Sequence, residues 1–198
     1  MADITRAAIA SESPYTVQAG RQLAEMGGNA VDIAVGSALA ATVSEALMCS
    51  LGGSAFIAIK RPRQSPELID GADAMPRIPA EVLRDEHRVW KQAIIPFGDG
   101  IRVNIGHAAV AVPGMLRALE LSWQRHGSLP WNELLEPAVA LARSGTTANQ
   151  TLVNWLGMAG KAVFFEQDES REAFFPDGET ALQQGEFYRA PHLDQSLE

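Results

Sequence analysis

Apolar residues recur at helical spacing over much of the chain, and start and stop signals divide them into segments. The first helix is predicted over residues 14–25, because proline fits its first turn and the Gly27-Gly28 pair can end it. Asn29 is expected to cap a second helix, whose many small residues would let another element approach closely. Further helices are predicted over residues 115–125, from the turn at 128–130 to Gly145, from 149 to about 162, and from His192 onward.

Short runs of β-branched and apolar residues predict a few strands. Residues 6–11 are compatible with a buried strand, and residues 110–112 with a short one. Two runs, residues 55–59 and 67–70, are joined by a polar segment and predict a β-hairpin. Residues 71–105 have little periodicity, so extended connections are expected there.

Composition excludes several classes of protein. The 198 residues carry 24 acidic and 16 basic side chains, a formal net charge of −8. This excess of acid argues against nucleic acid as a partner, because backbone phosphates are neutralised by clustered Lys and Arg. The single cysteine, Cys49, excludes an internal disulfide and a multi-cysteine zinc site. No repeat or shift in composition marks a second domain within residues 1–198.

The sequence predicts no membrane partner. The N-terminus has no basic run followed by a long apolar stretch, and the most apolar segment, residues 30–43, is interrupted by Asp32 and other polar residues. A bilayer-spanning helix needs about 20 predominantly apolar residues. A cytoplasmic location is therefore expected.

The residues alone form no self-contained catalytic set. Phosphate-binding loops, dinucleotide fingerprints and nucleophile elbows do not occur, and the four histidines are well separated, so no metal and no cofactor is predicted. Cys49 is interpreted as a small packed residue, with an activated nucleophile as the alternative. Asp32 is interpreted as an acceptor for amides at a helix N-terminus, with a catalytic role as the alternative. No catalytic residue is assigned to this chain.

Six segments, in order, carry a recognisable pattern. Residues 23–35 contain a glycine pair followed by Asn-Ala-Val-Asp-Ile-Ala-Val, and residues 126–145 contain His-Gly-Ser-Leu-Pro-Trp and then Glu-Pro-Ala-Val-Ala-Leu-Ala. The other four are residues 51–56 (Leu-Gly-Gly-Ser-Ala-Phe), 69–70, 106–114 and 175–178 (Phe-Pro-Asp-Gly). Together they resemble the large chain of the gamma-glutamyltranspeptidase family, which belongs to the N-terminal-nucleophile hydrolases. The oxamate amidohydrolase branch of that family is one candidate.

The resemblance implies an α+β fold, a four-layer αββα sandwich completed by a second chain. In the family a precursor cuts itself, and the new N-terminal threonine of the small chain becomes the nucleophile, with its own α-amine as base. Residues 1–198 would then be a single partial domain from the N-terminal part of the large chain. The small chain, from the same precursor, is the expected protein partner.

A Thr-Thr pair within the chain superficially resembles the start of the family's small chain. Thr146 and Thr147 are nevertheless not expected to be a processing site, because they follow a predicted helix and no strand is expected around them.

One departure from the family pattern concerns substrate binding. The family's Asp-x-Arg-Glu-x-x-Pro segment, whose arginine holds the α-carboxylate of a gamma-glutamyl group, here reads Asp-Gly-Ala-Asp-Ala-Met-Pro. Ala72 stands in the place of the arginine and Asp73 in that of the glutamate. Alanine cannot make a bidentate contact with a carboxylate. Ala72, Asp73 and Arg77 are the predicted substrate-binding residues, with Arg77 or Arg102 as a replacement anchor and the 49–54 loop as a weaker candidate.

The departure favours an amidohydrolase acting on a small amide other than a gamma-glutamyl compound, such as oxamate. One alternative is a glutathione hydrolase or gamma-glutamyltransferase with a relocated carboxylate anchor. Another is a non-catalytic homologue that serves as a binding or scaffold protein.

Overall fold

The computed structural model describes residues 7–77, 91–106, 109–165 and 167–198. Within these ranges four helices are 12 residues or longer: α1 (Pro14–Glu25), α2 (Ala30–Ser44), α4 (Met115–His126) and α5 (Trp131–Ser144). The strands are β1 (Ala55–Ile59), β2 (Glu67–Gly71), β3 (Lys91–Ile95), β4 (Ile101–Ile105), β5 (Thr146–Thr147) and β6 (Phe187–Tyr188). The shorter helices are α6 (Gln150–Trp155), the π-helical stretch η2 (Leu156–Phe164), α7 (Asp168–Phe174) and α8 (Leu193–Leu197).

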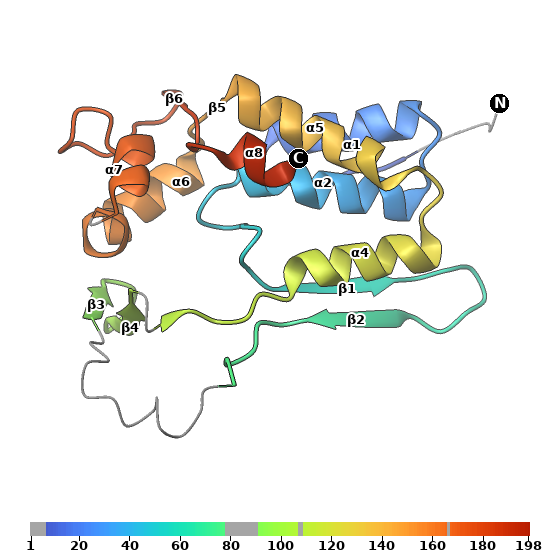
Figure 1. The fold of residues 1–198 in the computed structure, drawn as a ribbon, viewed down its shortest axis with the longest axis horizontal. Coiled ribbons are helices and arrows are strands. Elements are labelled where there is room, and N and C mark those ends of the chain that lie inside the picture. Colours follow the sequence, from blue (N-terminus) through green and yellow to red (C-terminus); the bar gives the residue numbers. More distant parts are fainter. Residues whose placement is uncertain (1–6, 78–90, 107–108, 166) are drawn as a thin grey trace.

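Helices α1, α2 and α5 pack against one another, and α4 lies between this layer and the β1–β2 hairpin (Figure 1). The main core is built from their apolar side chains, among which Leu23, Leu39 and Leu134 are completely buried. At Gly36 of α2 an added Cβ would lie 2.1 Å from Leu23 Cδ1, so only glycine allows α1 this close. The expected close approach to the second helix is confirmed.

The start of α2 is fixed by a capping box. The Asn29 side chain accepts hydrogen bonds from the backbone amides of Val31 and Asp32, at 2.7 and 3.2 Å, and the Asp32 carboxylate accepts from Asn29 N at 2.8 Å. These contacts satisfy amides that have no partner inside the helix. The interpretation of Asn29 and Asp32 as N-terminal capping residues is confirmed.

The predicted hairpin forms as antiparallel strands β1 and β2 and extends one residue further, to Gly71. One face packs toward α4 and includes the buried Ile69. The other face leaves Phe56 and Leu68 each 66% exposed. The hairpin is therefore covered on one face only by the described part of the chain.

The expectation of extended connections over residues 71–105 is wrong for residues 91–105. Strands β3 and β4 form a second antiparallel hairpin, in which Ala93 pairs with Val103. Gly98 and Gly100 between them take positive φ angles of 60° and 94°, a turn conformation that favours glycine. Cross-strand pairing and these turn residues together stabilise strands whose individual hydrophobic pattern is weak.

Two other strand predictions are not met in the described residues. Residues 7–11 are extended but pair with no described strand, and residue 6 lies outside the described range. Residues 110–112 reduce to one bridge between Ala74 and Val112. A strand needs a neighbouring strand to satisfy its backbone N–H and C=O groups. Among the described residues, the first segment has no such neighbour and the second has only the one bridge.

A smaller apolar cluster forms where α6, η2 and α7 meet. Leu152, Phe174, Phe175 and Tyr188 are among its buried members. The helix predicted over residues 149–162 is confirmed as far as Trp155 and continues as π-helix, whereas α7 was not predicted. The Tyr188 hydroxyl donates to the Val43 carbonyl at 2.8 Å and so ties this cluster to the end of α2.

Within the described ranges, no helix is both long and apolar enough to cross a bilayer.

Candidate functional site

Three loops meet beside the ends of β1 and β2. The Gly53 carbonyl accepts from Met115 N at 3.0 Å and from Gly114 N at 3.3 Å, which joins the 49–54 loop to the start of α4. Ala74 and Val112 exchange two backbone hydrogen bonds, at 3.0 and 2.8 Å. Residues 72–77, which carry the predicted site residues, therefore lie between the 49–54 loop and the segment that leads into α4.

Asp73 is fixed by Ser54. The Asp73 amide donates to Ser54 Oγ at 3.0 Å, and the Ser54 hydroxyl donates in turn to Asp73 Oδ1. Both residues are exposed, so the pair faces open space beside the loops. The sequence predicts the 49–54 loop only as a weaker candidate for substrate binding. Ser54 itself was missed, because nothing in the local pattern indicates a bond across 19 residues.

Ala72 is exposed, and its amide donates to Asp70 Oδ1 at 2.9 Å, a local turn that fixes the backbone but brings no cation. Arg77 is exposed, and Arg102 lies on β4. The side chains of these two arginines form no hydrogen bond or ion pair with any described residue. The structure therefore joins Asp73 to the loops around Ala72 and fixes neither arginine beside them.

Gly114 allows the loops to come this close. A Cβ added there would lie 2.4 Å from the Gly71 carbonyl oxygen and 2.5 Å from that of Ala72, closer than real Cβ atoms come to backbone. The Gly114 φ of −112° is open to any residue, so the restriction comes from space and not from backbone conformation.

Gly114→Ala is expected to lower the free energy of unfolding by about 1–3 kcal/mol, because residues 71–72 must move to admit the methyl group. Thermal unfolding of the variant measures the loss. Gly52→Ala is the matched control, since an added Cβ at Gly52 has no neighbour within 4 Å. Equal stability of the two variants would show that the loops are not packed as described.

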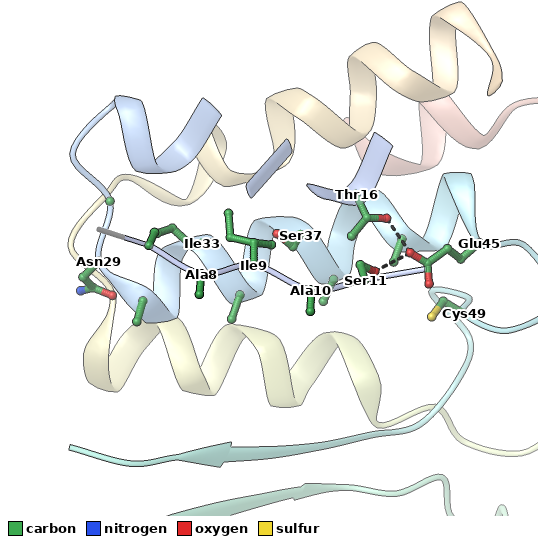
Figure 2. A pocket seen from close by; sticks show the side chains of 16 residues that line it. Ala8, Ile9, Ala10, Ser11, Thr16, Asn29, Ile33, Ser37, Glu45 and Cys49 are labelled. Atoms are coloured by element: carbon green, nitrogen blue, oxygen red, sulfur yellow. Dashed lines mark hydrogen bonds between the residues drawn. The ribbon is translucent and has the colours of Figure 1, made fainter. Parts of the chain in front are cut away.

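A groove of about 820 Å³ lies between residues 7–11 and α2 (Figure 2). Its walls are mostly alanine and isoleucine side chains, with Glu45 and Cys49 at one end. Burial, and then the nearby Glu45 and Glu12 carboxylates, raise the pKa of the Cys49 thiol above its usual value of 9.0. The thiol therefore stays protonated at neutral pH, which fits a packing role and not that of an activated nucleophile.

The Thr-Thr pair does have strand context, contrary to expectation. Thr146 and Thr147 form β5, which pairs with β6. Thr146 is buried, and the Thr147 hydroxyl lies 3.2 Å from the Tyr15 hydroxyl. Across the part of the chain that the structure describes, no group of three or more His, Cys, Asp or Glu side chains is arranged to hold a metal ion.

A family model, curated relatives and solved structures all match this chain, and all belong to the same family. Residues 16–198 match the family model described as gamma-glutamyltranspeptidase. The chain is 31% identical to the Escherichia coli (strain K12) "Glutathione hydrolase proenzyme", covering 96% of this chain and 31% of that protein. It is 28% identical to the Schizosaccharomyces pombe "Glutathione hydrolase proenzyme 2", covering 98% of this chain and 30% of that protein. The chain thus spans less than a third of the length of these curated relatives.

Solved structures share the fold. Helicobacter pylori gamma-glutamyltranspeptidase superposes with a TM-score of 0.77 at 24% identity, covering 98% of this chain and 53% of that one. The Bacillus anthracis transpeptidase CapD gives 0.74 at 23% identity, covering 97% of this chain and 56% of that one. The predicted α+β fold class is confirmed by these matches. With the family match over most of its length, the chain belongs to the gamma-glutamyltranspeptidase family.

Proposed function

We propose that this chain is the N-terminal part of the large chain of a two-chain amidohydrolase. Residues 1–198 would form a single partial domain, and a small chain from the same precursor would carry an N-terminal threonine as nucleophile. Family membership carries this proposal, and the word "proenzyme" in the names of curated relatives supports it. A cytoplasmic location is part of the same proposal.

The exposed face of the β1–β2 hairpin supports a second chain. Phe56 and Leu68 stand on the face opposite α4, each 66% exposed. Burying such side chains contributes about 1.5–3 kcal/mol each. A second β-layer packed on this face would cover them, as the αββα architecture requires.

The chemistry would begin with attack of the threonine hydroxyl on the amide carbonyl carbon of the substrate. The threonine α-amine takes the hydroxyl proton and passes it to the leaving nitrogen as the C–N bond breaks. Water then hydrolyses the acyl ester and regenerates the hydroxyl. Residues 71–77, with Asp73 held by Ser54, would form part of the pocket wall at the far end of the substrate.

Two substrate classes each rest on one observation. Glutathione hydrolysis is favoured by the names of the relatives. An amide without the gamma-glutamyl carboxylate, such as oxamate, is favoured by Ala72, beside which the structure fixes no cation among the described residues. If Arg77 or Arg102 binds the α-carboxylate of glutathione, glutathione is a substrate even though position 72 is alanine.

Assay of the processed two-chain protein with glutathione and with oxamate tests the proposal. Release of glutamate or of ammonia, together with two chains on a denaturing gel, is the expected result. Fast glutathione cleavage with high affinity would exclude the oxamate interpretation. An uncut precursor that hydrolyses neither amide would favour a non-catalytic binding or scaffold homologue instead.

A further inference from the structure

Two short segments, residues 72–76 and 109–114, lie side by side next to the candidate site. Ala74 and Val112 exchange backbone hydrogen bonds at 3.0 and 2.8 Å. Residues that face each other across an antiparallel bridge project their side chains to the same side. The Ala72 carbonyl oxygen lies 2.5 Å from the place that a Cβ on Gly114 would occupy, so Ala72 also lies against the second segment.

The two segments expose apolar side chains. Asp73 is the one polar side chain in their sequence, and its carboxylate is hydrogen-bonded to Ser54. Exposed apolar side chains that gather in one place mark a site for a ligand or a partner. The exposed aliphatic side chains of the two segments are called the apolar patch here: Ala72, Ala74, Val110 (64% exposed) and Val112 (50% exposed).

No described residue holds a positive charge at the apolar patch. The sequence departs here from the family pattern, in which an arginine stands at position 72. Arg77, the next cation along this segment, is exposed and forms no ion pair or hydrogen bond with a described residue. The Asp73 carboxylate repels a second carboxylate that comes near it. The patch therefore fits an uncharged apolar group better than an anionic one.

We infer that the apolar patch binds an apolar acyl group of the amide substrate, with Ala72 and Val112 as specificity-determining residues. The inference rests on the amidohydrolase function proposed above and narrows its substrate class. An aliphatic or aromatic acyl group, and not a carboxylate, lies against position 72. Alanine at this position leaves open the space that an arginine side chain would fill, and the valine methyl groups supply the apolar contact.

Two anilides of equal size separate an apolar from an anionic acyl group. Glutaryl anilide ends in a carboxylate, and 5-methylhexanoyl anilide carries an isopropyl group in its place. The processed two-chain protein is expected to cleave 5-methylhexanoyl anilide with a kcat/KM at least about tenfold higher, because each buried methyl group favours binding about fourfold.

Val112→Thr tests the patch itself. Threonine keeps the size and branched Cβ of valine and the backbone bonds to Ala74, but it puts a hydroxyl in place of one methyl group. The preference for 5-methylhexanoyl over glutaryl anilide is expected to fall about three- to tenfold. This preference is a ratio measured on one enzyme, so a loss of folded protein does not change it. Val17→Thr is the matched control, because α1 lies in the helical layer, away from the β1–β2 hairpin (Figure 1).

Equal kcat/KM values for the two anilides would overturn the inference and would mean that the second chain covers the patch. A higher value for glutaryl anilide would overturn it in favour of a carboxylate anchor such as Arg77. A preference that Val112→Thr changes no more than Val17→Thr would overturn it as well.

Binding of 5-methylhexanamide, measured by calorimetry, is a readout that needs no catalysis. Binding that is at least about tenfold tighter than that of glutaramate is expected, and equal or absent binding would overturn the inference. A protein that binds this amide with that preference but cleaves neither anilide would refute the proposed function and support the inference.

Discussion

Asp32→Ala is expected to lower the free energy of unfolding by about 3–5 kcal/mol, because it removes the buried carboxylate that three partly buried backbone amides and one hydroxyl share as acceptor. Asp32 has no exposed surface. Its carboxylate accepts from Asn29 N at 2.8 Å, from Ser128 N at 2.9 Å and from Leu129 N at 3.3 Å, and the Ser128 hydroxyl also donates to it. Alanine would leave these donors without a partner inside the protein.

The same carboxylate fixes two parts of the fold at once. Through Asn29 it sets the first turn of α2, and through Ser128 it holds the loop that leads into α5. Trp123 donates to the Leu129 carbonyl at 2.7 Å, and its ring lies 5.3 Å from that of Trp131. Two of the four tryptophans of the chain therefore report on this loop during urea or thermal unfolding.

Asp32→Asn is expected to lose less than Asp32→Ala, since the amide oxygen still accepts. Glu25→Ala is the control for loss of a surface carboxylate: its pair with Arg21, at 2.8 Å, is 61–74% exposed and is worth about 0–1 kcal/mol. An Asp32→Ala variant as stable as the Glu25→Ala variant would contradict the structural role assigned to Asp32.

The sequence pattern predicted the capping residues at the start of α2 but not the partners that lie far away along the chain. Asn29 and Asp32 act within one helical turn, so their spacing alone indicates a capping box. The link from Asp32 to Ser128 spans 96 residues, and no local pattern indicates it. The Asp73–Ser54 pair is a second case, in which the motif located the acid and only the fold supplied its partner.

Strand predictions depended most on neighbours. The β1–β2 hairpin was predicted because both of its strands and the polar connection are contiguous. Strands β3 and β4 were missed because the pattern Lys-Gln-Ala-Ile-Ile has no clear alternation, and pairing with the next strand decides its structure. Residues 7–11 have strand-like composition, but their backbone finds no partner in the described chain.

Restoring an arginine at position 72 addresses the substrate directly. Ala72→Arg is expected to lower the KM for a γ-glutamyl anilide by about ten- to hundredfold, because a bidentate contact with a carboxylate is worth about 1.5–3 kcal/mol. Ala72 is exposed and its backbone is held by Asp70, so a long side chain has room to extend from a fixed position.

Two comparisons decide whether that gain comes from the α-carboxylate. A γ-aminobutyryl anilide differs from the γ-glutamyl anilide by lacking this carboxylate, so its KM is expected to stay unchanged in the Arg variant. Ala72→Lys carries the same charge without the planar fork and is expected to gain less. If Arg77 or Arg102 already anchors the carboxylate, wild-type KM for the γ-glutamyl anilide will be low and Ala72→Arg will not improve it. Equal gains for both anilides would mean that the added arginine acts by general attraction, so that position 72 does not face the carboxylate.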